Sequence, residues 1–125
     1  MGKKKKILIV EDEVEFAEIV QARLQGLGYD VSIAEDAYQG NKAIINEPPD
    51  LVILDLSMPV GDGFTLLKRI CSDPSIENPE VVILTGQTVD EKLRKQARRY
   101  NVAEIFTKPY DRVKFVEKIQ SLVPV

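Results

Sequence analysis

Residues 51–55 read Leu-Val-Ile-Leu-Asp, a short run of branched apolar residues that ends in an acid. A run of this length and composition is typical of a β-strand that is buried on both faces. Similar runs recur at residues 7–10, 31–34, 81–84 and 104–106. We therefore predict five strands, and the segments between them determine how the strands pack.

The segments between these runs have the period of α-helices. In the first, apolar residues recur at helical spacing up to Gly28, a residue typical of a helix end. Aspartates that can cap a helix precede the second, fourth and fifth segments, at Asp36, Asp90 and Asp111. The third helix must end before Pro74, because proline cannot continue a helix. The apolar residues of the first helix are Phe16, Ile19, Val20, Leu24 and Leu27.

Strands and helices therefore alternate five times along the chain. Such an alternation produces right-handed crossovers, so that helices cover both faces of one parallel sheet. We predict a single-domain, flavodoxin-like α/β fold, a doubly wound (βα)5 sheet of five parallel strands in the order 2-1-3-4-5. With 125 residues, of which 44% are hydrophobic, the chain has the size and composition of one domain.

Composition narrows the class of protein. The net charge of -3 argues against a binder of duplex nucleic acid, which needs a basic face. No apolar stretch approaches the roughly 20 residues that span a bilayer. The basic lead-in of residues 1–6 precedes only a short apolar run, unlike a signal peptide. We expect a cytoplasmic protein without direct DNA binding, membrane contact or a further domain beyond 1–125.

The chain has a single cysteine, Cys71, within the third predicted helix. We expect a small buried thiol on the apolar side of that helix. One cysteine cannot form an internal disulfide, which fits a reducing compartment.

Charged or hydroxyl-bearing residues stand at the ends of four of the five runs. They are Glu11 and Asp12 after the first, Asp55 after the third, Thr85 after the fourth and Lys108 after the fifth. The carboxyl ends of parallel strands lie along one edge of the sheet. We therefore expect these residues to converge in one acidic pocket that contains one lysine.

Three carboxylates in one small pocket need a positive counter-charge. Mg²⁺ supplies it, because this hard cation prefers oxygen ligands and takes few of them from the protein. Any one acid, taken alone, could equally be a solvated turn residue or a helix cap, as we expect for Glu13. Pro109 favours an extended Lys108 that points toward the acids, and Thr85 can donate a hydrogen bond. Together they predict a phosphoryl-binding site with Asp55 as the nucleophile.

In this order and spacing, the residues resemble those of the receiver domain of two-component response regulators. The resemblance covers essentially the whole chain. It is carried by residues 7–10 with Glu11-Asp12, by Asp55, by Met58-Pro59 with Asp62-Gly63, by Thr85-Gly86 and by Lys108-Pro109.

The resemblance implies that Asp55 accepts a phosphoryl group from a phosphohistidine of a sensor histidine kinase or a histidine phosphotransfer protein. This chain contains no histidine and cannot be that donor. The resemblance also implies that Asp12, Asp55 and the backbone carbonyl of Ser57 bind Mg²⁺ directly, with Glu11 acting through water. Such a protein is a switch that assists its own phosphorylation and dephosphorylation, rather than an enzyme.

By the same matching of positions, Thr85 and Lys108 would contact the phosphoryl oxygens. Ser57 and Gln87 lie two residues past Asp55 and Thr85. In this family, residues at these two places influence how easily water attacks the acyl phosphate. The alternative, that Ser57 and Gln87 are ordinary loop residues, leaves the chemistry unchanged.

The chain departs from the family at the switch. The family couples the threonine to an aromatic residue three positions before the lysine, and here that position is Ile105. The neighbouring Phe106 should face the opposite side of its strand and is no obvious replacement. This difference puts the usual rotamer readout in doubt without touching the phosphorylation chemistry.

The fourth predicted helix is strongly basic on a chain that is acidic overall. Either it is a solvated face, or it is an output surface for an acidic downstream partner or a second copy of the chain. The basic residues are Lys92, Arg94, Lys95, Arg98 and Arg99.

Two other functions use similar residues. A metabolic phosphohydrolase with an aspartate nucleophile would place that aspartate after the first strand and the acidic pair late, which is the reverse of the order seen here. A binding module that signals without phosphorylation would keep the fold, and Ile105 keeps this alternative open.

Overall fold

The computed structural model describes residues 3–58 and 63–125. Strands and helices alternate along these residues, as predicted from the hydrophobic pattern. In chain order the elements are β1 (Lys6–Val10), α1 (Val14–Gly26), β2 (Asp30–Ala34), α2 (Ala37–Asn46), β3 (Leu51–Leu54), α3 (Gly63–Ser72), β4 (Glu80–Thr85), α4 (Glu91–Arg99), β5 (Glu104–Thr107) and α5 (Arg112–Leu122).

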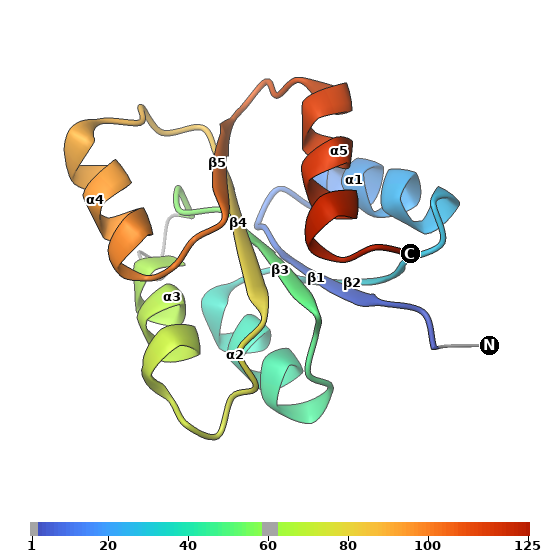
Figure 1. The fold of residues 1–125 in the computed structure, drawn as a ribbon, viewed down its shortest axis with the longest axis horizontal. Coiled ribbons are helices and arrows are strands. Elements are labelled where there is room, and N and C mark those ends of the chain that lie inside the picture. The colour runs from blue at the N-terminus through green and yellow to red at the C-terminus, as the bar shows by residue number, and fades with distance from the viewer. Residues whose placement is uncertain (1–2, 59–62) are drawn as a thin grey trace.

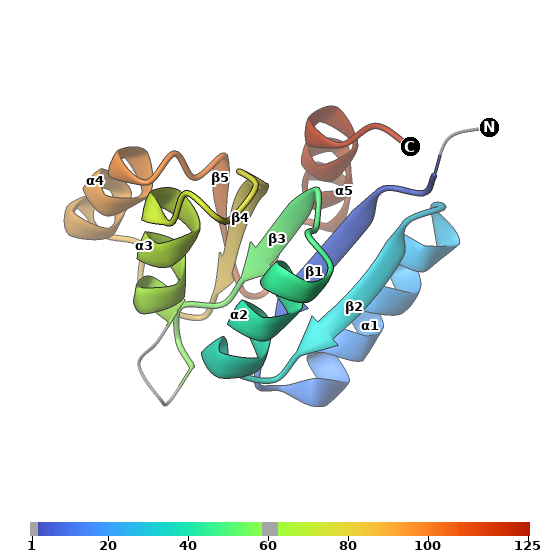
Figure 2. The ribbon, with the colours of Figure 1, turned by 90° about the horizontal axis from the view of Figure 1, so that it is seen from below.

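The strands form one parallel sheet in the order β2-β1-β3-β4-β5. Helices α1 and α5 cover one face, and α2, α3 and α4 cover the other (Figures 1 and 2). The register places the last residues of neighbouring strands side by side, with Val10 paired to both Ala34 and Leu54. The predicted doubly wound sheet and its strand order are therefore confirmed, and its carboxyl edge is well aligned.

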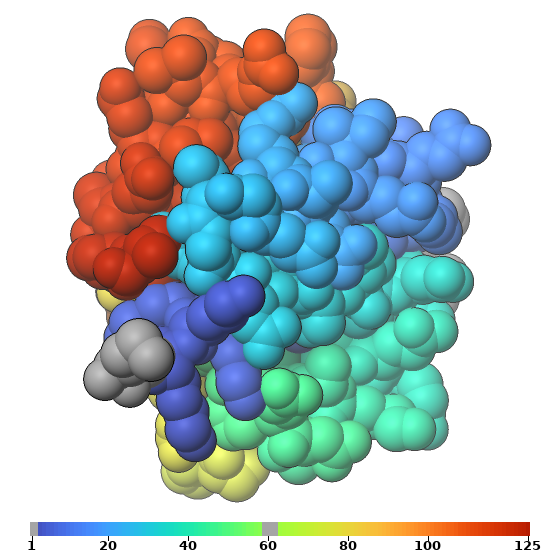
Figure 3. Space-filling view, turned by 90° about the vertical axis from the view of Figure 1, so that its right-hand side faces the viewer, coloured from blue at the N-terminus to red at the C-terminus, as the bar shows by residue number. Residues whose placement is uncertain are grey.

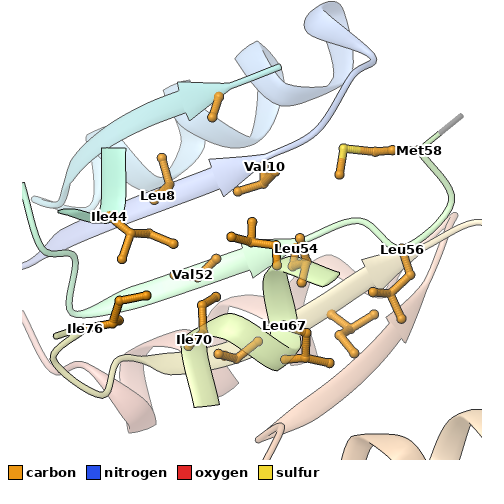
Figure 4. Close-up of a cluster of buried hydrophobic side chains, with 14 of the residues drawn as sticks. Leu8, Val10, Ile44, Val52, Leu54, Leu56, Met58, Leu67, Ile70 and Ile76 are labelled. Carbon is orange, nitrogen blue, oxygen red and sulfur yellow. The ribbon is translucent and has the colours of Figure 1, made fainter. Parts of the chain in front are cut away.

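The core consists of two clusters of buried side chains, one on each side of the sheet. Alternate residues of each central strand point to opposite clusters, so Leu8 and Val10 face α2 and α3 while Ile7 and Ile9 face α1 and α5. Figure 4 shows the first cluster, in which Leu67 of α3 packs over the sheet. Burial on both faces explains why the central strands are continuously apolar rather than alternating.

The predicted helix caps are present. The side chains of Asp36 and Asp90 each accept a hydrogen bond of 2.8 Å from the backbone N–H three residues on. Asp111 accepts two, of 3.0 and 3.1 Å, at the start of α5. At the end of α1, Gly28 has a φ of +104°, a left-handed conformation that glycine adopts without strain. Local side-chain chemistry therefore sets these boundaries.

The expectation of a buried thiol at Cys71 is wrong, because this residue is exposed. Helix α3 turns Leu67 and Ile70 into the core, and Cys71 lies about 100° further around the helix. Its Sγ donates a hydrogen bond of 2.9 Å to the backbone carbonyl of Tyr100, at the end of α4. The thiol therefore bridges the ends of two helices.

The basic lead-in lies at the amino edge of the sheet, where β1 begins at Lys6. Residues 3–6 line a shared depression of about 700 Å³ together with Pro124 and Val125, so the two ends of the described chain lie close together (Figure 3). Among the described residues, no helix combines the length and the apolar character needed to cross a membrane.

We predict that Gly63→Ala destabilises the protein. A Cβ at Gly63 would lie 2.9 Å from the backbone oxygen of Asp55 and 3.0 Å from Cα of Leu56. Since both contacts involve backbone, α3 has to shift, and overpacking of this kind costs about 1–3 kcal/mol of unfolding free energy. Urea denaturation followed by circular dichroism measures the loss.

Gly26→Ala is the matched control for Gly63→Ala. It lies in α1, and a Cβ there would meet nothing within 4 Å. Alanine is the better helix former, so this variant should gain about 0.5–1 kcal/mol. Equal effects of the two substitutions would contradict the packing argument.

Candidate functional site

The predicted site residues meet at the carboxyl edge of the sheet because backbone hydrogen bonds continue past the strand ends. Directly after β1 and β3, Glu11 N–H donates to the carbonyl of Ala34 at 3.0 Å and Asp55 N–H to that of Val10 at 3.1 Å. Beyond β5, Lys108 N–H donates to the carbonyl of Thr85 at 2.9 Å. The structure therefore brings together residues from the ends of four strands.

Three carboxylates form the acidic part of the site. One oxygen from each of Glu11, Asp12 and Asp55 lies within 4.8 Å of the others. Glu11 and Asp55 are each only 2% exposed, whereas Asp12 is exposed to solvent. An all-oxygen donor set with one open side matches the coordination preference of Mg²⁺, which keeps several waters. The chemistry of these residues fits the predicted cation.

Lys108 supplies the positive charge. Its Nζ donates to Glu11 Oε1 at 2.6 Å and to Asp55 Oδ2 at 3.4 Å, and its side chain is 15% exposed. Burial acts to lower the pKa of Lys108, but the hydrogen bond to Glu11 and the charge of Asp55 outweigh it and hold that pKa above its ordinary value. The peptide bond between Lys108 and Pro109 is cis. The ammonium therefore lies between two acids that come from different strands.

Two further contacts of Lys108 were not anticipated from the sequence. Glu13 occupies the N-cap position of α1, yet its side chain makes no capping hydrogen bond. Instead, Glu13 Oε1 lies 3.5 Å from Lys108 Nζ. The ammonium also lies over the ring of Phe16, 4.4 Å from its centroid. The spacing of Glu13 and Phe16, three residues apart at a helix start, is the one signal that could have indicated a shared partner.

The environment shifts the pKa values of the two buried carboxyl groups, Glu11 and Asp55, in opposite directions. Burial is the main cause that raises the pKa of Glu11 from 4.5 to about 7, although its hydrogen bond with Lys108 opposes the shift. Burial also acts to raise the pKa of Asp55. Hydrogen bonds from Ser57, a hydrogen bond with Glu11 and the charge of Lys108 outweigh burial, and they hold this pKa below its ordinary value. Near neutral pH, Asp55 is therefore an ionised carboxylate beside a carboxyl that readily holds a proton.

Ser57 binds Asp55 at close range. The backbone N–H and the hydroxyl of Ser57 donate to Asp55 Oδ1 at 2.8 and 2.6 Å. Gln87 links two loops of the site, because its backbone N–H donates to Thr85 Oγ1 at 3.2 Å and its Nε2 to the carbonyl of Leu56 at 3.3 Å. Thr85 is fully buried. Both residues expected to tune the site therefore lie against it.

At the switch position, Ile105 and Phe106 face opposite sides of β5, as predicted from the sequence. Ile105 is half-buried and packs with the cluster under α2, α3 and α4, whereas Phe106 packs with the opposite cluster, its ring centroid 5.3 Å from that of Phe115. Of the remaining motif residues, Met58 is buried in the core, and Pro59 and Asp62 lie outside the described residues.

Comparison with known proteins identifies the family. The sequence profile named "Response regulator receiver domain" matches residues 7–120. The chain is 32% identical over 120 residues to the DNA-binding dual master transcriptional regulator RpaA of Synechocystis. This alignment covers 94% of this chain and 48% of that protein. It is 30% identical to the probable chemotaxis protein CheY of Rhizobium etli, over 98% of this chain and 92% of that one.

Solved structures agree. The signal receiver domain of a DNA-binding response regulator from Colwellia psychrerythraea superposes with a TM-score of 0.88 at 30% identity, over 98% of this chain and 100% of that one. The chain therefore belongs to the response regulator receiver domain family. Receiver domains of this family are phosphoacceptor switches that work with histidine kinases or phosphotransfer proteins. The chain spans about half the length of RpaA.

We predict that metal-free protein loses stability as the pH rises from about 5 to about 7, because Glu11 is buried. With a folded pKa of about 7 against an ordinary 4.5, the folded protein keeps a proton that the unfolded chain has released. The free energy of unfolding is therefore highest at the acidic side of this window. Urea denaturation without divalent metal, at several pH values, measures the slope.

Glu11→Gln removes this titration, so its unfolding free energy should fall less over the same pH range than that of the unchanged chain. Glu18→Gln on the exposed side of α1 is the control and should keep the original slope. Parallel curves for the unchanged chain and Glu11→Gln would show that Glu11 does not titrate in this window.

Proposed function

We propose that Asp55 accepts a phosphoryl group from the phosphohistidine of a sensor histidine kinase or a histidine phosphotransfer protein, in a Mg²⁺-dependent reaction. The observation that carries the proposal is the buried Asp55 carboxylate, whose pKa is lowered and which lies 3.4 Å from the Lys108 ammonium beside two further acids. An ionised nucleophile next to a cation is what an in-line attack on phosphorus requires.

In the proposed step, an oxygen of Asp55 forms a bond to phosphorus while the bond from phosphorus to the donor imidazole breaks, and that electron pair stays on the imidazole. Lys108 moves from Glu11 toward the phosphoryl oxygens and offsets their charge. Thr85 donates its hydroxyl hydrogen to one of them. Mg²⁺, held by Asp12, Asp55 and the Ser57 carbonyl with Glu11 acting through water, would supply further positive charge.

Ser57 and Gln87 are proposed to set the lifetime of the acyl phosphate. The Ser57 hydroxyl, 2.6 Å from Asp55 Oδ1, lies where it can orient or exclude an attacking water. Gln87 holds the loop after β4 to the loop after β3 through its bond to the carbonyl of Leu56. Ser57 beside Asp55, and Gln87 on the loop after β4, are therefore placed to influence how water attacks the phosphorus of the acyl phosphate.

Phosphorylation adds negative charge and acceptor oxygens at Asp55. Thr85 would move toward them and carry along Gln87, whose N–H is bonded to its hydroxyl. Ile105 packs in the cluster that includes Leu93 of α4. We propose that this aliphatic contact takes the role that the rotamer change of the aromatic residue has in the family. It would transmit the movement of Thr85 and Gln87 to α4. Coupling of about 1–3 kcal/mol is typical for such transitions.

A second candidate function is a binding module that signals without phosphorylation. The observation that favours it is Ile105 at the switch position, because an aliphatic side chain lacks the ring whose rotamer change is the family's readout. The acidic cluster with Lys108 weighs against it, since buried charge is costly to keep without use.

We predict that incubation with acetyl phosphate and Mg²⁺ adds one phosphoryl group to the protein, seen by intact-mass spectrometry. Asp55→Asn should show no gain, because an amide is a poor nucleophile, and removal of Mg²⁺ should slow the reaction strongly. Asp30→Asn at the amino edge of the sheet is the control and should be modified normally. No mass gain under any condition would favour the binding module.

The output surface proposed for α4 lies beside a groove of about 380 Å³ between α4 and β5. Its lining residues include Arg94, Arg98 and Ile105. Arg98 pairs with Glu91 at 3.2 Å on the exposed surface, so that pair contributes little to stability. The guanidinium groups are thus available to an acidic downstream partner or a second copy of the chain.

We predict that the double variant Arg94→Glu with Arg98→Glu loses phosphorylation-dependent association, because it places like charges against an acidic surface. Analytical ultracentrifugation with and without acetyl phosphate measures self-association, and the same samples can be titrated with a downstream target. Lys114→Glu with Lys118→Glu on α5 makes the same change in charge and should behave like the unchanged chain. Unaltered association in the α4 variant would contradict this surface assignment.

A further inference from the structure

Phe16 is the one described contact of the Lys108 ammonium that carries no charge. The Nζ lies over the Phe16 ring at 4.4 Å from the centroid, inside the roughly 6 Å range in which a cation is attracted to an aromatic face. Phe16 comes from α1, one turn after Asp12, and not from a strand end. It is therefore independent of the motif residues that identify the site.

The other contacts of Lys108 compete with each other. Glu11 and Asp55 hold the ammonium inside the site, at 2.6 and 3.4 Å. Glu13, whose side chain is 68% exposed, attracts it outward at 3.5 Å. In the proposed reaction the carboxylate of Asp55 becomes an acyl phosphate, so the ion pair between Asp55 and the Lys108 ammonium changes. The Phe16 ring carries no reacting or titrating group, so its own charge distribution stays the same through the reaction.

The Phe16 ring is itself held in place. The ring of Tyr110 meets it edge-on, at 6.2 Å between centroids and 86° between planes. The hydroxyl of Tyr110 accepts a hydrogen bond of 2.6 Å from Arg23 Nη1, and the Tyr110 ring packs on Phe115 at 4.7 Å. An edge-to-face pair of this kind stabilises one ring orientation. Phe16 therefore offers Lys108 a fixed surface rather than a mobile one.

We propose that Phe16 is a positioning residue for Lys108, holding the ammonium at the mouth of the acidic site through a cation–π contact. This inference rests on the proposed function, since the position of the Lys108 ammonium affects the reaction only if Lys108 contacts a phosphoryl group. Without the ring face, Glu13 draws the lysine toward solvent, and the charge opposite the incoming phosphoryl oxygens is lost for part of the time.

The test replaces Phe16 site-specifically by 3,4,5-trifluorophenylalanine, which keeps the ring shape and weakens the negative charge of its face. The first readout is the nuclear magnetic resonance signal of the Lys108 ε-methylene in protein without metal or phosphoryl donor. A ring above which the lysine sits shifts this signal upfield. We expect the fluorinated protein and Phe16→Leu to lose the shift and Phe16→Tyr to keep it.

The second readout is the rate constant of phosphorylation by acetyl phosphate at saturating Mg²⁺. Loss of a partly desolvated cation–π contact should lower it roughly 3- to 10-fold in the fluorinated protein and in Phe16→Leu. Phe16→Tyr should react at nearly the original rate. In a Lys108→Met background, the changes at Phe16 should have no further effect, because the cation is absent.

Phe106 provides the matched control, since its ring packs in the same cluster and contacts Phe115. The same fluorinated residue at 106 should change neither readout. An unchanged Lys108 signal in the Phe16 proteins would overturn the positioning role even if all of them are phosphorylated. A lost signal in a protein that takes up no phosphoryl group would support the contact and refute the proposed function instead.

Discussion

The hold that Lys108 exerts on the acidic cluster is the interaction on which the site depends. Glu11 and Asp55 are each 2% exposed, and two like charges so deeply buried would repel each other without a counter-charge. The ammonium bridges them at 2.6 and 3.4 Å. It can do so only because β5 ends in register with β4. The aligned ends of the parallel strands thus place the lysine next to the two buried acids.

Much of this arrangement follows from the sequence. The central strands were predictable because burial on both faces leaves no room for polar residues. The helix starts were predictable because Asp36, Asp90 and Asp111 can each satisfy free backbone N–H groups. Convergence of the site residues then follows from the parallel sheet alone. The family match over residues 7–120 confirms the assignment made from the motif order.

What the sequence left undetermined depends on side-chain direction between elements. Glu13 looks like a helix cap by position, but its carboxylate reaches Lys108, 95 residues along the chain. Phe16 looks like a core residue by spacing, and its ring face meets the same lysine. Cys71 lies next to Ile70, and about 100° of helix rotation separates an exposed thiol from the core. Such outcomes follow from rotamers and packing, which periodicity does not encode.

The exposed thiol of Cys71 has a practical consequence. It is the only cysteine in the sequence, and it lies on α3 within hydrogen-bond distance of the carbonyl of Tyr100 at the end of α4. A maleimide dye would thus label the protein at one defined place without engineering. Although the residue is exposed, partial desolvation of its sulfur raises the pKa of this thiol, so labelling should be slower than for a free thiol at neutral pH. A dye at the junction of α3 and α4 would report the proposed displacement of α4 as a change in its fluorescence.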